Sequence, residues 1–461
     1  MLALAPNVRR KKVSLAMILM ILAFGGLVGY WLLNGLSANH SIEHGYVLVG
    51  GQHGNWFEMG QTPELYRVTI PDLSIEAIAP VSDGAVWTGD WNGSQWLISG
   101  WGAEPGAQGS NPYIYLYDGE NAIGGDSLKQ YENEATWHGG DIFGATYNGS
   151  DWLVSGLGSG ALEPWTFQAN HMGLALFDGR IFSDLSPEIP NQWDAPLFAN
   201  GWNGHYWLVG GGWEGNEGEL LKYEGSNLTD LSEQFESIVS FQSVQTIQWN
   251  GNYWLIGGVG FLMKYDGQNL TNLTPQLNEA LLRQNRLSTL NCCNSVNALA
   301  WNGSSWAIGG GAPVANTQPL RAWSAEFDGT SFKDTTAALP SNVAKPNSSS
   351  SILSITWTDG SWFFGGYADD RGMLFSLKGT SVDDLSYLVN NAFTSVNWVG
   401  GLSRPAEVRQ TNQTAQSSQS MSSLGVILIP GSKPTIKFGE TMPISLKHAD
   451  ERLSLNWDAR D

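Results

Sequence analysis

Cysteines and catalytic motifs are nearly absent from this chain. Its 461 residues include only two cysteines, which are adjacent at Cys292 and Cys293, so a network of conventional disulfides cannot hold the fold together. The chain contains no His-Glu-x-x-His pattern, no Walker loop, no Gly-x-Ser-x-Gly elbow and no EF-hand loop. The seven histidines are scattered. We therefore predict no metal site and no cofactor, assign no catalytic residue, and favour a non-enzymatic function without excluding catalysis.

Basic residues are also scarce. Lys and Arg together number 23 against 43 acidic residues, which gives a formal net charge of −20. A surface of this sign repels phosphate backbones, so the globular part is not expected to bind nucleic acid. Charged residues make up only 14% of a chain that has 22 tryptophans, and a field of one sign helps such a chain to stay dispersed.

The chain is instead rich in one repeated phrase. The phrase reads Trp-Asn-Gly, two variable residues, Trp, two or three apolar residues and then Gly-Gly or a close variant, as in Trp202–Gly211. Seven copies occur, the first of them partial, and their final glycines are 47 to 56 residues apart: Gly51, Gly100, Gly156, Gly211, Gly258, Gly310 and Gly366. This period is typical of propeller blades.

Each repeat reads as four short strands. An alternating run such as residues 244–249 predicts a half-buried strand. Asn-Gly then predicts a two-residue type I′ hairpin, and Asp359-Gly360 takes its place in the last copy. The apolar run that ends in Gly-Gly is the second strand, a run that ends in aromatic-Asp-Gly is the third, and a run such as residues 228–232 is the fourth. We predict an all-β fold, a seven-bladed β-propeller of four-stranded blades over residues 44–402.

The two ends of the ring are expected to pair. No first strand precedes Tyr46, whereas residues 394–398 match a first strand and have no repeat after them. This C-terminal strand is predicted to complete the first blade, which removes two exposed sheet edges.

The glycine-ended strand followed by a strand carrying Tyr-Asp resembles the kelch repeat and the wider galactose-oxidase-like propellers. The resemblance covers roughly residues 44–402, but Leu231 or Leu273 stands where kelch repeats have a tryptophan, and the Trp-Asn-Gly hairpin is an addition. It implies a propeller and a binding scaffold. The copper chemistry of galactose oxidase is not carried over, because no Tyr/Cys/His constellation is evident.

The N-terminus predicts a membrane anchor. Val13 to Leu33 are uncharged and long enough to cross a bilayer, and four basic residues precede them, so the propeller is expected outside the cytoplasm. A cleaved signal peptide is the alternative. Our predicted organisation has a basic cytoplasmic segment, a transmembrane signal anchor, a stalk, the propeller, a Gln/Ser/Thr-rich flexible linker and a C-terminal tail, over residues 1–12, 13–35, 36–43, 44–402, 403–423 and 424–461.

The loops that follow Gly-Gly and those between blades share one face of a propeller. They are long and carry aromatic residues outside the repeat, which suit sugar rings or peptides or, alternatively, simply cover the blade ends. The candidate ligand-binding residues on this loop face are Trp56, Trp101, Trp137, Trp165, Trp193, Trp213 and Trp323.

Two kinds of covalent modification are suggested. Asn-x-Ser/Thr sequons on the opposite face could carry glycans or could simply be by-products of the repeat; they include Asn92, Asn148, Asn227, Asn269 and Asn302. Cys292 and Cys293 either form a vicinal disulfide or stay free.

Two functions remain open from the sequence, with a purely structural surface protein as a third option. The first is a single-pass, membrane-anchored extracytoplasmic module that binds a protein or carbohydrate at the cell surface. The second is an exported propeller enzyme that acts on a polysaccharide or uses a quinone. An enzyme needs convergent carboxylates, His or Arg in a pocket, and a binding module does not.

Overall fold

The fold is described from a computed structural model. The chain separates into two compact units, residues 1–405 and 406–461. The described residues all belong to the first unit: 45–52, 64–70, 72–80, 84–102, 111–124, 131, 140–158, 171–189, 195–212, 218–238, 243–282, 295–313, 320–341, 343, 349–389 and 393–402.

Most of the described strands form antiparallel four-stranded sheets, each built from consecutive strands. Their bounds are β8 (Ile142–Tyr147), β9 (Trp152–Gly158), β10 (His171–Phe177) and β11 (Phe182–Asp184); β12 (Leu197–Trp202), β13 (Trp207–Gly212), β14 (Gly218–Tyr223) and β15 (Leu228–Asp230); β16 (Val244–Trp249), β17 (Trp254–Gly258), β18 (Phe261–Tyr265) and β19 (Leu270–Asn272); β20 (Ser295–Trp301), β21 (Trp306–Pro313), β22 (Leu320–Phe327) and β23 (Phe332–Asp334); and β24 (Ser350–Thr358), β25 (Ser361–Ala368), β26 (Arg371–Lys378) and β27 (Ser381–Asp384).

The remaining strands form one eight-stranded sheet, in which a single residue pair, Gln52 with Ala85, joins β1 to β4. On one side of this junction β28 pairs with β1, β1 with β2 and β2 with β3. On the other side β4 pairs with β5, β5 with β6 and β6 with β7. The bounds are β1 (Tyr46–Gln52), β2 (Glu64–Thr69), β3 (Ile75–Pro80), β4 (Gly84–Trp91), β5 (Trp96–Gly102), β6 (Asn111–Tyr117), β7 (Ala122–Gly124) and β28 (Ser395–Leu402).

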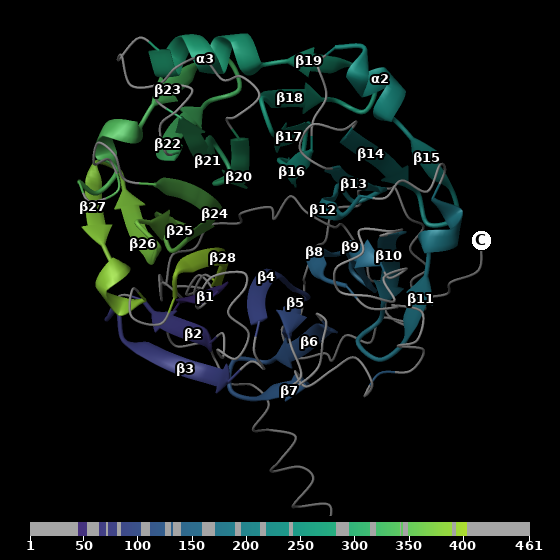
Figure 1. The fold of residues 1–461 in the computed structure, drawn as a ribbon, viewed down its shortest axis with the longest axis horizontal. Helices are drawn as coiled ribbons and strands as arrows, with labels where there is room; N and C mark the ends of the chain where they lie inside the picture. Colours follow the sequence, from purple (N-terminus) through teal and green to yellow (C-terminus); the bar gives the residue numbers. More distant parts are fainter. Residues whose placement is uncertain are drawn as a thin grey trace, which may run out of the picture. The chain divides into compact units, whose positions relative to one another are not determined.

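The first strands of these units, β4, β8, β12, β16, β20, β24 and β28, surround a common centre (Figure 1). Each contacts the next, and β28 contacts both β24 and β4, so the circle is closed. The pairing of β28 with β1 extends from Tyr46–Leu402 to Gln52–Ser395. The predicted closure by the C-terminal strand is therefore confirmed, and the sheet order is that of a β-propeller.

The predicted type I′ turn is found at Asp359-Gly360, where φ is +49° and +76°, but it is wrong for the Asn-Gly copies. In the hairpin after Trp91 only Gly93 has positive φ, +99°. Asn92 Oδ1 instead accepts the backbone N–H groups of Ser94 and Gln95, at 2.9 and 2.8 Å. The asparagine side chain thus closes the turn itself, a local competition between side chain and backbone that the type I′ prediction did not consider.

The second glycine of each copy is required by a close approach of two backbones. A Cβ built on Gly310 would lie 1.8 Å from the Ser295 carbonyl oxygen, and the six other copies give 1.9 to 2.3 Å to the equivalent carbonyl. At this point the first strand has a β-bulge, for example between Val296 and Ala298 in β20. Only glycine can lie opposite such a bulge without displacing the neighbouring strand.

The first glycine of each Gly-Gly pair packs against an aliphatic side chain of the next sheet. A Cβ on Gly257 would lie 2.5 Å from Val296 Cγ1, and one on Gly309 would lie 2.7 Å from Ile352 Cγ2. These aliphatic knobs are fully buried. Gly-Gly therefore lets neighbouring sheets interlock at the centre of the ring.

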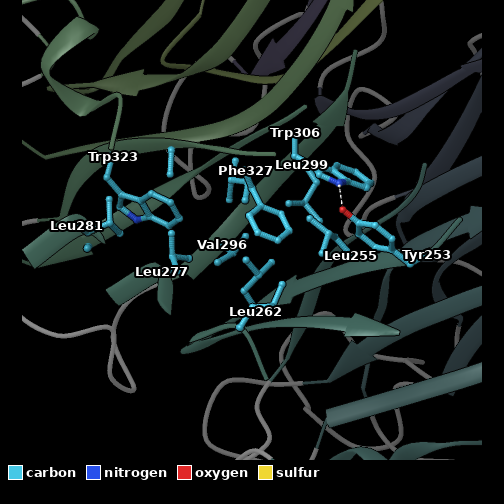
Figure 2. Close-up of a cluster of buried hydrophobic side chains, with 14 residues drawn as sticks. Tyr253, Leu255, Leu262, Leu277, Leu281, Val296, Leu299, Trp306, Trp323 and Phe327 are labelled. Atoms are coloured by element: carbon cyan, nitrogen blue, oxygen red, sulfur yellow. Dashed lines mark hydrogen bonds between the residues drawn. The ribbon is translucent and has the colours of Figure 1, made fainter. Parts of the chain in front are cut away.

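The paired tryptophans of the phrase are structural. They face each other across the first hairpin, with ring centroids 5.1 Å apart for Trp301 and Trp306. Trp306 is fully buried, and its indole Nε1 donates to Tyr253 Oη of the preceding sheet at 3.0 Å (Figure 2). Sheet-to-sheet contact thus combines apolar packing with a hydrogen bond that satisfies the buried indole N–H.

Short helical turns connect successive sheets: η3 (Ser186–Glu188), α2 (Ser232–Glu236), α3 (Thr274–Leu282), η4 (Thr336–Ala338) and η5 (Ser386–Leu388). In α2, Asp230 Oδ1 accepts the backbone N–H of Ser232, whose hydroxyl oxygen accepts the N–H of Leu220 in the third strand. The same first hydrogen bond occurs in all five of these connections, from an Asp-x-Ser/Thr motif in four of them and from Asn272-x-Thr274 in α3.

The membrane anchor, stalk, linker and tail predictions fall on residues 1–43 and 403–461, which lie outside the described residues. Among the residues that are described, no helix is both long and apolar enough to span a bilayer.

We predict that Gly310→Ala lowers the free energy of unfolding by about 3 kcal/mol or more, because the new Cβ must push β20 away from β21. The control is Gly303→Ala in the hairpin of the same sheet. There φ is +94° but nothing lies within 4 Å, so only about 1–2 kcal/mol of backbone strain is expected. Urea denaturation of both variants measures the difference, and equal losses would contradict the close-approach explanation.

Candidate functional site

The β-bulges determine which side chains face the centre of the ring. Each first strand has one residue that the pairing register skips, as Trp87 is skipped between Val86 and Thr88 in β4. The skipped residues are Trp87, Phe143, Phe198, Gln245, Asn297, Leu353 and Asn397. All of them line one central cavity of about 670 Å³, a volume typical of small-molecule sites.

The cavity opens on the loop face that the sequence predicts for ligand binding. Tyr367 and Asp370, from β25 and the turn after it, belong to its lining, as do Asp141 and Ser349, which precede first strands. These positions lie in or beside the connections after Gly-Gly and between sheets.

One side of the cavity is an arc of aromatic rings. Trp87 and Phe143 contact edge to face with centroids 5.7 Å apart, and Phe143 and Phe198 are tilted at 5.1 Å. All three rings are only partly buried. Because they come from the consecutive strands β4, β8 and β12, they form a continuous apolar wall.

The other side carries amides. Gln245 Nε2 donates to Ser243 Oγ at 2.7 Å, and Asn297 Nδ2 donates to Ser351 Oγ and to the Ile352 carbonyl at 3.0 and 3.1 Å. Asn397 Oδ1 accepts the Ser395 hydroxyl at 2.7 Å, but its buried Nδ2 has no partner among the described residues. This side, which we call the polar wall, therefore carries three amides, with Leu353 of β24 between Asn297 and Asn397.

Asp141 and Asp370 are the charged residues of the described lining, and no Lys, Arg or His contributes to it. Burial raises the pKa of the Tyr367 hydroxyl, and the nearby Asp370 carboxylate raises it further, against a lowering hydrogen bond with Ser349. The cavity thus favours neutral ligands over anions.

A second cavity of about 350 Å³ lies along the first strands, and it shares the skipped residues with the first. Asp90 is the carboxylate in its lining. Burial raises the pKa of Asp90 to about 6, although its Oδ2 accepts the Tyr147 backbone N–H at 2.6 Å. Asp90 thereby links β4 to β8.

Among the predicted loop-face residues, Trp323 was assigned wrongly. It lies within β22 opposite Gly310 and is 0% exposed, packed in a cluster with Leu277 and Leu281 (Figure 2). Its ring covers the space that the missing glycine side chain leaves, with Cζ2 3.1 Å from a Cβ built there. The third strand begins earlier than the sequence pattern suggested, so a strand residue was taken for a loop residue.

Of the other predicted tryptophans, one lies in a described strand and five lie outside the described residues. Trp101 lies in β5, where it pairs with Pro112 and Ala85. The rest lie outside the described residues: Trp56, Trp137, Trp165, Trp193 and Trp213. Cys292 and Cys293 lie outside them as well.

The sequon asparagines lie in hairpin turns. Asn92, Asn148 and Asn302 each accept two backbone N–H groups through Oδ1. Asn227 and Asn269 are exposed. Their use as glycan sites stays a prediction.

Sequence reasoning missed most of the cavity residues, although a signal was present. In each copy an aliphatic residue such as Val244 or Ile352 is followed by the skipped residue, and then usually by a small or hydroxyl residue. The skipped position holds Trp, Phe, Gln, Asn or Leu in different copies, whereas the flanking pattern repeats. Aligning the copies with one another would have separated the repeated scaffold from this variable position.

The described residues contain no group of three or more His, Cys, Asp or Glu side chains placed to hold a metal ion.

The chain matches no protein-family model and no curated protein. Its similarities are to solved structures. They include the β-propeller domain of the Trilobed protease from Pyrococcus furiosus (11% identity, TM-score 0.40, 74% of this chain and 98% of that one). The GH74 xyloglucanase from Xanthomonas campestris (11%, 0.43, 67% and 46%) and TolB from Acinetobacter baumannii (11%, 0.36, 78% and 83%) are also similar. The chain spans less than half of the xyloglucanase. These similarities are too distant to inform function.

Asp90 generates a pH-dependent prediction. Since its folded pKa of about 6 exceeds the ordinary 3.8, the folded state holds more protons between these values, and the free energy of unfolding falls as pH rises through this window. Asp90→Asn keeps an acceptor for the Tyr147 N–H but cannot ionise. The variant should be about 1–3 kcal/mol more stable than the unchanged protein at pH 7 and equally stable below about pH 4.

Urea denaturation at several pH values tests this prediction. Asp178→Asn, in an exposed turn, is the control for a general change in net charge. A difference between Asp90→Asn and the unchanged protein that is the same at pH 4 and pH 7 would contradict the assignment.

Proposed function

We propose that this chain is a seven-bladed, kelch-like β-propeller that is anchored in the membrane by residues 13–35 and binds a carbohydrate outside the cytoplasm, in the cavity at the mouth of its central channel. Seven blades are supported by the sheets, because dividing the eight-stranded sheet at the Gln52–Ala85 pair gives two units beside the five four-stranded sheets. The uncharged segment at 13–33 and the basic residues before it support the anchor.

The observation that supports carbohydrate binding is the division of the cavity into two walls. Trp87, Phe143 and Phe198 offer an apolar surface against which the C–H face of a sugar ring can pack. Gln245, Asn297 and Asn397 offer amides at the opposite side, where hydroxyl groups need donors and acceptors. A sugar ring has both properties, because its face presents apolar C–H groups and its rim carries polar hydroxyl groups.

A protein segment is the competing ligand, and catalysis is the competing activity. Asp141 and Asp370 both line the cavity, and paired carboxylates are what glycoside hydrolysis uses. Asp370 is exposed in a turn where its φ is +58°, whereas the general acid of a glycosidase is typically held in an apolar pocket. Binding without turnover is therefore the preferred function.

The test is a glycan array probed with the purified full-length chain in detergent, together with Trp87→Ala. Truncation removes the largest ring of the aromatic arc, so binding should fall about tenfold or more. The matched control is Tyr387→Ala, because Tyr387 is 63% exposed on the outer connection η5 and lies away from the cavity.

Binding that Trp87→Ala reduces and Tyr387→Ala preserves would support the proposal. The proposal would fail if no glycan binds a chain shown to be folded by circular dichroism, or if the two variants weaken binding equally. Release of shortened oligosaccharides that stops in Asp141→Asn would instead establish the enzyme.

A further inference from the structure

One amide nitrogen in the polar wall of the cavity, that of Asn397, makes no hydrogen bond among the described residues. Asn397 is 6% exposed, and it is the skipped residue of β28 between Val396 and Trp398. Its Oδ1 accepts the Ser395 hydroxyl, while Nδ2 is buried and has no partner among the described residues. Buried polar side chains normally satisfy both groups, so an unpaired donor beside a cavity needs an explanation.

The equivalent residue of another sheet makes the contrast clear. Asn297 occupies the same bulge position in β20, yet its Nδ2 makes two hydrogen bonds to β24, with Ser351 Oγ and the Ile352 carbonyl. Asn297 therefore joins two sheets. The Nδ2 of Asn397 makes no such hydrogen bond among the described residues, and Asn397 lines the same cavity.

The charges around the cavity restrict what can accept this hydrogen bond. The described lining has two carboxylates, Asp141 and Asp370, and no basic side chain, and the whole chain has a net charge of −20. A phosphate, sulfate or uronate would meet repulsion with no cation to compensate it. A hydroxyl, ring or acetamido oxygen accepts the amide N–H without this penalty.

We propose that Asn397 is a specificity-determining residue that donates Nδ2–H to an uncharged oxygen of the ligand, and that the ligand is a neutral saccharide. The inference rests on the proposed function, because it names the ligand class and a contact of the same cavity. The sugar face packs against Trp87, Phe143 and Phe198 while an oxygen on its rim bonds to Asn397.

Titration calorimetry with soluble pentasaccharides tests the ligand class, again with the full chain in detergent. The neutral probes are built of glucose, xylose, mannose or N-acetylglucosamine; the cationic probe is the deacetylated glucosamine pentamer and the anionic probe is the galacturonate pentamer. At least one neutral probe should bind more than tenfold more tightly than the anionic probe, which meets two carboxylates and no basic side chain. Equal or tighter binding of a charged probe would overturn the assignment of a neutral ligand.

The Asn397 contact is tested with the tightest probe. Asn397→Ala should weaken binding about tenfold, since a buried donor to the ligand is lost. Its thermal midpoint should fall less than that of Asn297→Ala, because within the described protein the Asn397 side chain has one hydrogen bond, from the Ser395 hydroxyl to Oδ1, whereas Asn297 makes two to β24. Asn397→Asp, which keeps the shape but replaces the donor by an anionic acceptor, should bind at least as weakly.

Asn297→Ala is the matched control, and it should lower the thermal midpoint more than Asn397→Ala does. If Asn397→Ala binds as the unchanged protein does while Trp87→Ala loses binding, the Asn397 inference is wrong and the carbohydrate site stands. If no probe binds and Trp87→Ala has no effect on the glycan array, both the inference and the proposed function fail.

Discussion

The structure depends on the contact between a second-strand glycine and a first-strand carbonyl in every sheet. In the seven copies, a Cβ on that glycine would lie 1.8 to 2.3 Å from the carbonyl oxygen. Where the backbones come this close the ladder slips by one residue, and the residue that is left unpaired faces the centre of the ring. The same contact therefore sets the packing of the sheets and supplies the lining of the cavity. A bulge that re-aims a side chain at a functional site is a common use of this feature.

This constraint divides the aromatic residues into two classes. The tryptophans of the repeated phrase pair across hairpins and are buried between sheets, where the Trp306–Tyr253 hydrogen bond also connects neighbours. The rings at skipped positions, Trp87, Phe143 and Phe198, contact one another along the cavity and remain partly exposed. The skipped residue has no partner in the ladder. The ladder therefore does not restrict its side chain, which can differ between sheets and suit the ligand. Some skipped residues also serve the scaffold, since the Asn297 amide joins β20 to β24, whereas the Asn397 Nδ2 has no partner among the described residues.

Much of the fold could be predicted from the sequence because each repeat carries the same local strand and turn patterns. The period of the glycines, the alternating first strands and the orphan strand at residues 394–398 are local patterns, and each corresponds to a strand or closure in the structure. The turn types were not fully predictable, because the equivalent hairpins at Asn92 and Asp359 are closed differently. The Asn92 side chain accepts backbone N–H groups, whereas Asp359 and Gly360 both have positive φ. The site was missed because it arises from register: nothing in the composition of residues 84–91 says that Trp87 is skipped. Trp323 was misplaced for the related reason that strand ends are poorly marked.

We propose that the ring of skipped residues around the cavity is a carbohydrate site. The most direct measurement is a crystal structure of the protein with the tightest-binding oligosaccharide. Our account predicts a sugar ring packed against Trp87, Phe143 and Phe198, with an oxygen within hydrogen-bond distance of Asn397 Nδ2. A saccharide bound on the outer strands or at the hairpin face, with the central cavity unchanged, would contradict it.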